Sequence, residues 1–300
     1  MTLERRGSRR ALTWLAVLFL FVLLLALANE YTDGERFYGA APLTVTAIAM
    51  VGLFGLQRLT AESDVWRFRT SHIAAMTAGA VLYTVLAYVF NDLLALSIGQ
   101  VVLSPQVCVP VLCGYAFGPI VGFFTGAVGT LLGDFATGWG VFPTWDIGNG
   151  VTGMVPGLVT LLAGRKRGLR DVSVLVVVVI ASLATIVFIH PRAPEPWTGE
   201  IQDFSFWAWA LLIGGVVMVA NGVLLEQLNV PLAAVNLWGT FGIIAGTGFA
   251  SLAAIWVDGY SLATALVGEF APAAATDILN LMLFAPLVLA GYRAVRARKP

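Results

Sequence analysis

The residues that could bind a ligand are a few carboxylates, amides and tryptophans in an otherwise apolar sequence. Asp277 and Asn280 are three residues apart, so on a helix their side chains lie on the same face. Carboxylates and amides can hydrogen-bond a polar ligand, and tryptophan rings can stack on a planar one. We predict that six residues contribute to substrate binding: Asp134, Trp139, Trp145, Asn149, Asp277 and Asn280.

Structural roles remain open for several of these polar residues. Asp134 ends a glycine-rich stretch, where a solvated helix end would also suit a carboxylate. Trp139 and Trp145 fit an aromatic belt at a membrane interface. We interpret Asp146 as a helix cap, because a carboxylate at the start of a helix accepts hydrogen bonds from free backbone N–H groups.

The residues needed for common kinds of catalysis are missing from the sequence. The only histidines are His72 and His190, which the predicted topology places at opposite membrane faces, so they cannot share a metal or relay a proton. Cys108 and Cys113 are five residues apart and point to different helix faces. There is no HExxH, GxSxG or phosphate-binding GxxxxGK[ST] motif. We therefore predict no enzyme activity, no metal and no cofactor.

The composition indicates that lipid is the solvent around most of this chain. Of 300 residues, 59% are hydrophobic and only 11% are charged. The formal net charge is zero, which argues against a nucleic-acid partner. Apolar stretches near the roughly 20 residues needed to cross a bilayer recur throughout. They predict an all-α, polytopic transmembrane bundle with about ten spans: Ala11–Ala28, Gly39–Leu56, Ile73–Phe90, Val101–Tyr115, Gly118–Phe135, Ile147–Ala163, Val172–Ile189, Phe206–Leu225, Leu232–Val257 and Ala273–Tyr292.

The basic residues orient these spans. With the amino terminus inside, every Lys and Arg except Arg36 and Arg192 falls on the cytoplasmic side, as the positive-inside rule requires. We predict a multi-pass protein of the cell membrane with both termini in the cytoplasm. Several polar residues then converge on the outer side, which predicts a shallow, outward-facing pocket. They are Asn91, Asp92, Gln100, Gln106, Asp134, Asp146, Asn149, Glu269, Asp277 and Asn280.

Glycines at helical spacing predict close contact between neighbouring spans. Because lipid gives no hydrophobic drive between helices, small residues that let backbones approach are a main source of packing energy. One helix face carries glycines at spacings of four, four, three and four residues, and the next span carries two more. The predicted helix-packing residues are Gly118, Gly122, Gly126, Gly129, Gly133, Gly153 and Gly157.

This passage resembles the substrate-binding S component of energy-coupling-factor (ECF) transporters. The resemblance rests on a turn of the type Gly-x-x-Phe-Gly-Pro, a glycine-rich helix ending in Asp, and a following helix with Gly-x-x-Pro-Gly. The matching residues are Gly114, Phe117, Gly118, Pro119, Gly122, Asp134, Gly150, Gly153, Pro156 and Gly157. The span Ile73–Phe90 is similar to the family's first helix, and this similarity implies that its small residues Ala74 and Ala78 dock on the coupling subunit.

The resemblance implies a six-helix core plus extra helices. Residues 1–70 are then two transmembrane helices with a cytoplasmic linker, and residues 71–300 are the S-component-like domain with an inserted hairpin at residues 172–228. It also implies a subunit that captures a vitamin-like organic micronutrient from outside for ATP-driven uptake, with transmembrane coupling and ATPase subunits as partners. Two alternatives remain: a stand-alone secondary transporter, and an integral membrane enzyme, which the missing motifs disfavour.

Overall fold

The computed structural model describes most of the chain after the first fifty residues. The described residues are 51–52, 55, 57–58, 63–98, 101–159, 167–228 and 230–297. The predicted span Ala11–Ala28 lies outside them, and only residues 51, 52 and 55 of the predicted span Gly39–Leu56 are described. The rest is mostly helical, as the sequence predicts.

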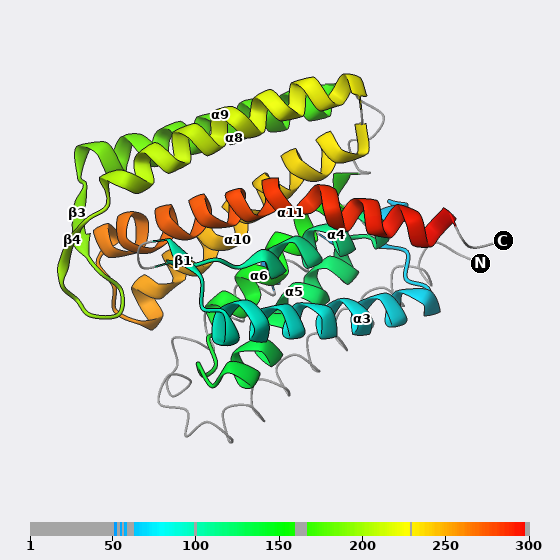
Figure 1. The fold of residues 1–300 in the computed structure, drawn as a ribbon, viewed down its shortest axis with the longest axis horizontal. Coiled ribbons are helices and arrows are strands. Elements are labelled where there is room, and N and C mark those ends of the chain that lie inside the picture. The colour runs from blue at the N-terminus through cyan, green and yellow to red at the C-terminus, as the bar shows by residue number, and fades with distance from the viewer. Residues whose placement is uncertain are drawn as a thin grey trace.

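The described part of the chain contains eight α-helices and two small hairpins (Figure 1). The helices are α3 (Thr70–Ala87), α4 (Cys108–Phe117), α5 (Pro119–Thr137), α6 (Pro143–Gly157), α8 (Arg167–Ile189), α9 (Ser205–Leu228), α10 (Val230–Val257) and α11 (Ala271–Ala297). Strand β1 (Ser97–Ile98) pairs with β2 (Val101–Val102), and β3 (Arg192–Pro194) pairs with β4 (Ile201–Asp203), both antiparallel. Short helical segments occupy Asp64–Trp66, Tyr88–Leu93, Pro105–Val107 and Thr264–Phe270.

Five helical stretches in the described part are long and apolar enough to cross a membrane. They are Thr70–Leu93, Pro119–Thr137, Val172–Ile189, Pro231–Val257 and Thr264–Ala294. Pro105–Phe117 and Ser205–Asn221 are shorter apolar helices. The chain is therefore a helical membrane protein, and the total of about ten spans remains a prediction.

The fourth predicted span, Val101–Tyr115, is partly wrong. Val101 and Val102 form strand β2, and the α-helix begins only at Cys108 after a turn that starts at Pro105. Proline lacks the N–H that a helix needs beyond its first turn, so the helix cannot extend back through this point. With 10 residues, α4 is about 15 Å long, half the thickness of a bilayer core.

The junction between α4 and α5 is as tight as the sequence predicts. Only Gly118 separates the two helices, with φ of 102°, a conformation that residues with a Cβ rarely adopt. Pro119 then occupies the first position of α5, where a backbone N–H would have no acceptor within the helix, so its absence costs no hydrogen bond.

Six helices form a bundle centred on the contact between α5 and α6, and two more helices lie to one side. Helix α6 packs against α4, α5 and α10, while α3 covers α5 and α11 packs on α10 and α4. Helices α8 and α9 pack against each other and run together along one edge of the bundle (Figure 1). The fold is thus a six-helix bundle with an additional helix pair, and the assignment of that pair as an insertion remains a prediction.

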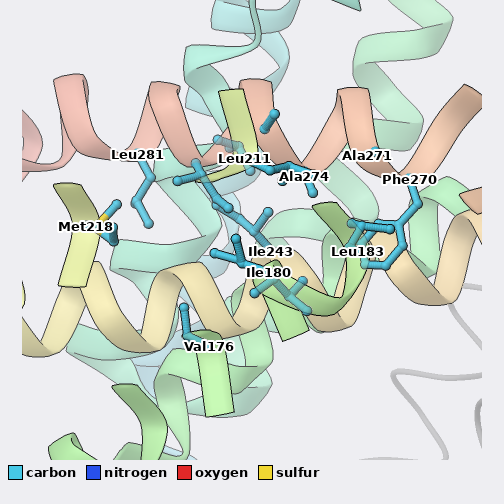
Figure 2. Close-up of a cluster of buried hydrophobic side chains, with 14 of the residues drawn as sticks. Val176, Ile180, Leu183, Leu211, Met218, Ile243, Phe270, Ala271, Ala274 and Leu281 are labelled. Carbon is cyan, nitrogen blue, oxygen red and sulfur yellow. The ribbon is translucent and has the colours of Figure 1, made fainter. Parts of the chain in front are cut away.

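A buried apolar cluster attaches the α8–α9 pair to the other helices (Figure 2). Ile180 and Leu183 of α8 and Leu211 of α9 meet Ile243 of α10 and Ala274 of α11, and each is at most 5% exposed. A second cluster of buried residues lies between α5 and α6, where Phe123 and Ile147 are at most 1% exposed. Burial of this kind is worth roughly 25 cal/mol per Å² of apolar surface where water is the alternative, and less where it is lipid.

Glycines on α5 let two different neighbours approach it. A Cβ at Gly122 or Gly126 would collide with the backbone carbonyl of Gly153 or Asn149 on α6. Further along the same helix, a Cβ at Gly129 would lie 2.7 Å from the Cβ of Tyr83 on α3. One glycine face therefore contacts α6 along its first half and α3 along its second.

We expect Gly126→Ala to destabilise the protein by about 1–3 kcal/mol, because the added methyl group overlaps the main chain of α6 and backbone atoms cannot rotate away. The matched control is Gly291→Ala in α11, where a Cβ would meet no atom within 4 Å. Alanine favours a helix over glycine by about 1 kcal/mol, so this control should melt at the same temperature as wild type or higher. Equal melting of both variants in detergent would contradict the close contact.

Candidate functional site

A cavity of 530 Å³ lies at the end of the bundle that carries the β3–β4 hairpin, called here the hairpin end. Its size is typical of small-molecule sites. Segments distant in sequence contribute to its wall: the ends of α3 and α5, the start of α6, the turn between β3 and β4, and the start of α11. The cavity therefore depends on the tertiary fold rather than on any one motif.

Five of the six predicted binding residues line this cavity: Asp134, Trp139, Trp145, Asn149 and Asp277. Asn280 does not line it. It lies about one turn further along α11, is 1% exposed, and its backbone carbonyl accepts a hydrogen bond from the Cys108 thiol at 3.4 Å. Spacing of three residues puts Asp277 and Asn280 on a similar face, but only Asp277 lines the cavity. The binding role of all six remains a prediction.

The predicted convergence of outer polar residues is partly visible in the structure. Asn91, Gln106 and Glu269 also line the cavity. Gln106 donates from Nε2 to Oδ1 of Asn91 at 3.0 Å, while its own Oε1 is buried without a partner among the described residues. Asp92 is exposed outside the cavity, and Gln100 is outside the described residues.

Asp146 does not cap helix α6, so that interpretation is wrong. The residue preceding the helix is Phe142, which provides no side-chain cap, and Asp146 lies one turn inside. It is fully buried, and within the described part of the chain neither carboxylate oxygen has a hydrogen-bond partner. Pro143 is the first residue of the helix, so the cap position is Phe142, which precedes Asp146 by one helical turn.

Trp145 and Glu269 form the clearest polar contact across the cavity. The indole Nε1 of Trp145 on α6 donates to Oε1 of Glu269 at 3.3 Å, joining the start of α6 to the segment Thr264–Phe270. Trp145 thus has a specific polar partner as well as its aromatic face. A belt role alone would not need this bond.

The turn between β3 and β4 closes one side of the cavity with Glu195, Pro196 and Trp197. The carboxylate of Glu195 accepts hydrogen bonds from the backbone N–H groups of Trp197 and Thr198 at 3.0 and 2.6 Å, which fixes the turn. The hydroxyl of Tyr260 donates to the carbonyl of Pro196 at 3.1 Å. Three hydrogen bonds therefore hold this turn over the cavity.

Sequence reasoning missed several cavity residues for two different reasons. Thr130 precedes Asp134 by one helical turn and Tyr83 lies opposite it on α3, so helical spacing could have identified Thr130. Glu195 and Trp197 belong to an outer turn that folds back toward the bundle, and no local sequence pattern predicts this. Among the described residues, no group of three or more His, Cys, Asp or Glu side chains is arranged to hold a metal.

The geometry defines a class of protein: a helical membrane protein with a partly open cavity whose wall includes aromatic and acidic side chains. A family model described as the ECF-type riboflavin transporter S component matches residues 67–193. The chain therefore belongs to the UPF0397 family of ECF S components. The resemblance noted in the glycine-rich passage is confirmed.

Individual relatives agree with this assignment. A UPF0397 protein of Vibrio atlanticus is 32% identical over 133 residues, which cover 39% of this chain and 68% of that protein. One from Aliivibrio salmonicida is 42% identical over 64 residues, 21% of this chain and 35% of the relative. One from Streptococcus pneumoniae strain Hungary19A-6 is 27% identical over 159 residues, which cover 52% of this chain and 84% of that protein. The chain spans about a third of the Aliivibrio protein. No solved structure matches.

We expect Trp145→Phe to destabilise the protein by about 1–3 kcal/mol, because it leaves a mostly buried Glu269 oxygen without its donor while keeping an aromatic ring. Trp256→Phe is the control, since the side chain of Trp256 is 69% exposed on α10. Melting temperature in detergent is the measurement. A loss as large in the control would show that the indole bond has no particular role.

Proposed function

We propose that this chain is the substrate-capture subunit of an ECF-type importer, binding a vitamin-like organic micronutrient for ATP-driven uptake. Family membership supports the transporter class, and the observation that carries the proposal is the 530 Å³ cavity at the hairpin end. Its wall combines indole and phenyl rings with amides and carboxylates, which suits an organic ring system better than a bare ion. The chain acts by binding, not by catalysis.

The cavity faces outward in this proposal, and both termini lie in the cytoplasm of a cell whose plasma membrane holds the protein. Arg67 and Arg69 precede α3, and Arg293 lies near the end of α11. Asn91 beyond α3 and Asp277 near the start of α11 instead line the cavity. Basic residues and the cavity therefore occupy opposite ends of these helices, as the positive-inside rule favours for an outward-facing site.

The substrate class is an organic micronutrient. Riboflavin, which appears in the description of the matching family, is one compound of this class, and its size suits a cavity of 530 Å³. Trp139, Trp145 and Trp197 provide flat rings for stacking on such a ligand.

Helix α3 provides the proposed docking face for the transmembrane coupling subunit. Ala74 and Ala78 are exposed on it, one turn apart, beside the exposed Val81 and Leu82. The opposite face of α3 packs on α5 through residues such as Ala80 and Tyr83. Small residues at this spacing let another helix approach closely. The ATPase subunits then act through the coupling subunit.

We expect Ala78→Leu to abolish assembly with tagged coupling and ATPase subunits, because a branched side chain blocks close helix approach. Ala181→Leu is the matched control: Ala181 is also exposed, but on α8. Co-purification measures assembly. ATP-dependent uptake of labelled water-soluble vitamins, riboflavin included, is measured in proteoliposomes. It should be lost in Ala78→Leu and retained in Ala181→Leu.

Two outcomes would contradict the proposal. Assembly that survives Ala78→Leu would remove α3 as the docking face. Uptake by the chain alone, driven by an ion gradient without nucleotide, would instead establish the secondary transporter.

A further inference from the structure

The charged groups around the cavity are all of one sign. Among the described residues that line it, four are acidic, Asp134, Glu195, Glu269 and Asp277, and none is Lys, Arg or His. Taking this cavity as the ligand site, as the proposed function does, we propose that its ligand is an aromatic organic cation.

The four carboxylates differ in whether the protein already satisfies them. Glu195 accepts two backbone N–H groups, and Glu269 accepts the indole N–H of Trp145. Among the described residues, no group donates a hydrogen bond to the carboxylate of Asp134 or Asp277. Asp134 is only 9% exposed, yet it lines the cavity. The protein thus holds one nearly buried, unpartnered acid at the cavity wall.

An unpaired carboxylate in a membrane protein is costly, and such residues usually pair with a partner of opposite charge. Asp134 on α5 and Asp277 on α11 have no such partner in the described part of the chain, and both face the same cavity. A positively charged ligand supplies it. A neutral ligand can donate hydrogen bonds to these acids but supplies no opposite charge, and an anion would be repelled by the carboxylates that line the cavity.

The aromatic side chains favour the same charge. Trp139, Trp145 and Trp197 line the cavity with Phe142, whose ring meets that of Trp197 edge to face at 5.8 Å. Trp139 and Trp197 are 46% and 63% exposed, so their rings are accessible to a ligand. Indole faces attract cations as well as stack on planar rings. Carboxylates and indoles together therefore select a ring with a positive charge.

The test uses three bicyclic probes that differ mainly in charge: 1-methylquinolinium, 2-methylquinoline and quinoline-2-carboxylate. Each is titrated calorimetrically into the purified full-length chain near neutral pH. The cation should bind at least about tenfold more tightly than the neutral ring, and the anion should bind least. Asp134→Asn and Asp277→Asn should each weaken the cation about tenfold, or about 1.4 kcal/mol, and leave the neutral ring unchanged.

Asp203→Asn is the matched control. Asp203 lies at the end of β4 outside the cavity lining, and hydrogen bonds from the side chain and backbone N–H of Ser205 lower its pKa, so it carries a charge at neutral pH. It should not change the affinity of any probe. Melting temperatures of all variants confirm folding, and either cavity variant suffices if the other does not fold.

Preference for the neutral or anionic probe, equal weakening by Asp203→Asn, or no binding of the cation would each overturn the inference. Riboflavin is uncharged, so measuring its binding as well distinguishes a failure of the charge preference from a failure of the proposed function. Tight riboflavin binding without cation binding would reject the charge preference and leave the S-component function standing. Cation binding without ATP-dependent uptake or subunit assembly would reject the importer and leave the charge preference.

Discussion

Contact between helix backbones without intervening side chains is the constraint on which the rest of this structure depends. Helix α6 lies between α5 and α10, and glycines form both interfaces. A Cβ at Gly148 would lie 2.7 Å from the carbonyl oxygen of Gly246 on α10, and one at Gly153 would overlap that of Gly122 on α5. In lipid, dispersion contact of this kind replaces the hydrophobic drive that assembles soluble cores. The position of α6 then fixes where Trp145 and Asn149 enter the cavity.

Short and irregular helices leave space for the cavity. Longer, regular helices would pack closely and fill that space. Helix α4 has 10 residues and α6 has 15, so neither covers the whole thickness of a bilayer core. The segments Tyr88–Leu93 and Thr264–Phe270 have the wider π-helical turn, which is frequent at functional sites. They carry Asn91 and Glu269 to the cavity wall. Close glycine contacts thus hold the helices together, while the wider turns at the hairpin end form part of the cavity wall.

The sequence predicts those parts of the site that depend on local spacing. Asp134, Asn149 and Asp277 are polar residues at the ends of recognisable apolar spans, and all three line the cavity. Errors occur where tertiary structure decides. Asn280 shares a helix face with Asp277 but lies a turn away from the cavity, and Glu195 reaches it only because a hairpin folds back. Helical periodicity specifies direction around an axis, whereas membership of a cavity also depends on depth along it.

The wall of the cavity combines residues from within the family match with residues that follow it. That match ends at residue 193, and Glu195, Trp197, Glu269 and Asp277 all follow it. The α8–α9 pair brings the first two to the cavity, because the apolar cluster anchors its helices and hydrogen bonds at Glu195 and Pro196 hold its turn. Only Asp134 among the four acids lies within the matched range. The charge of this cavity is therefore mainly a property of the chain's own later segments.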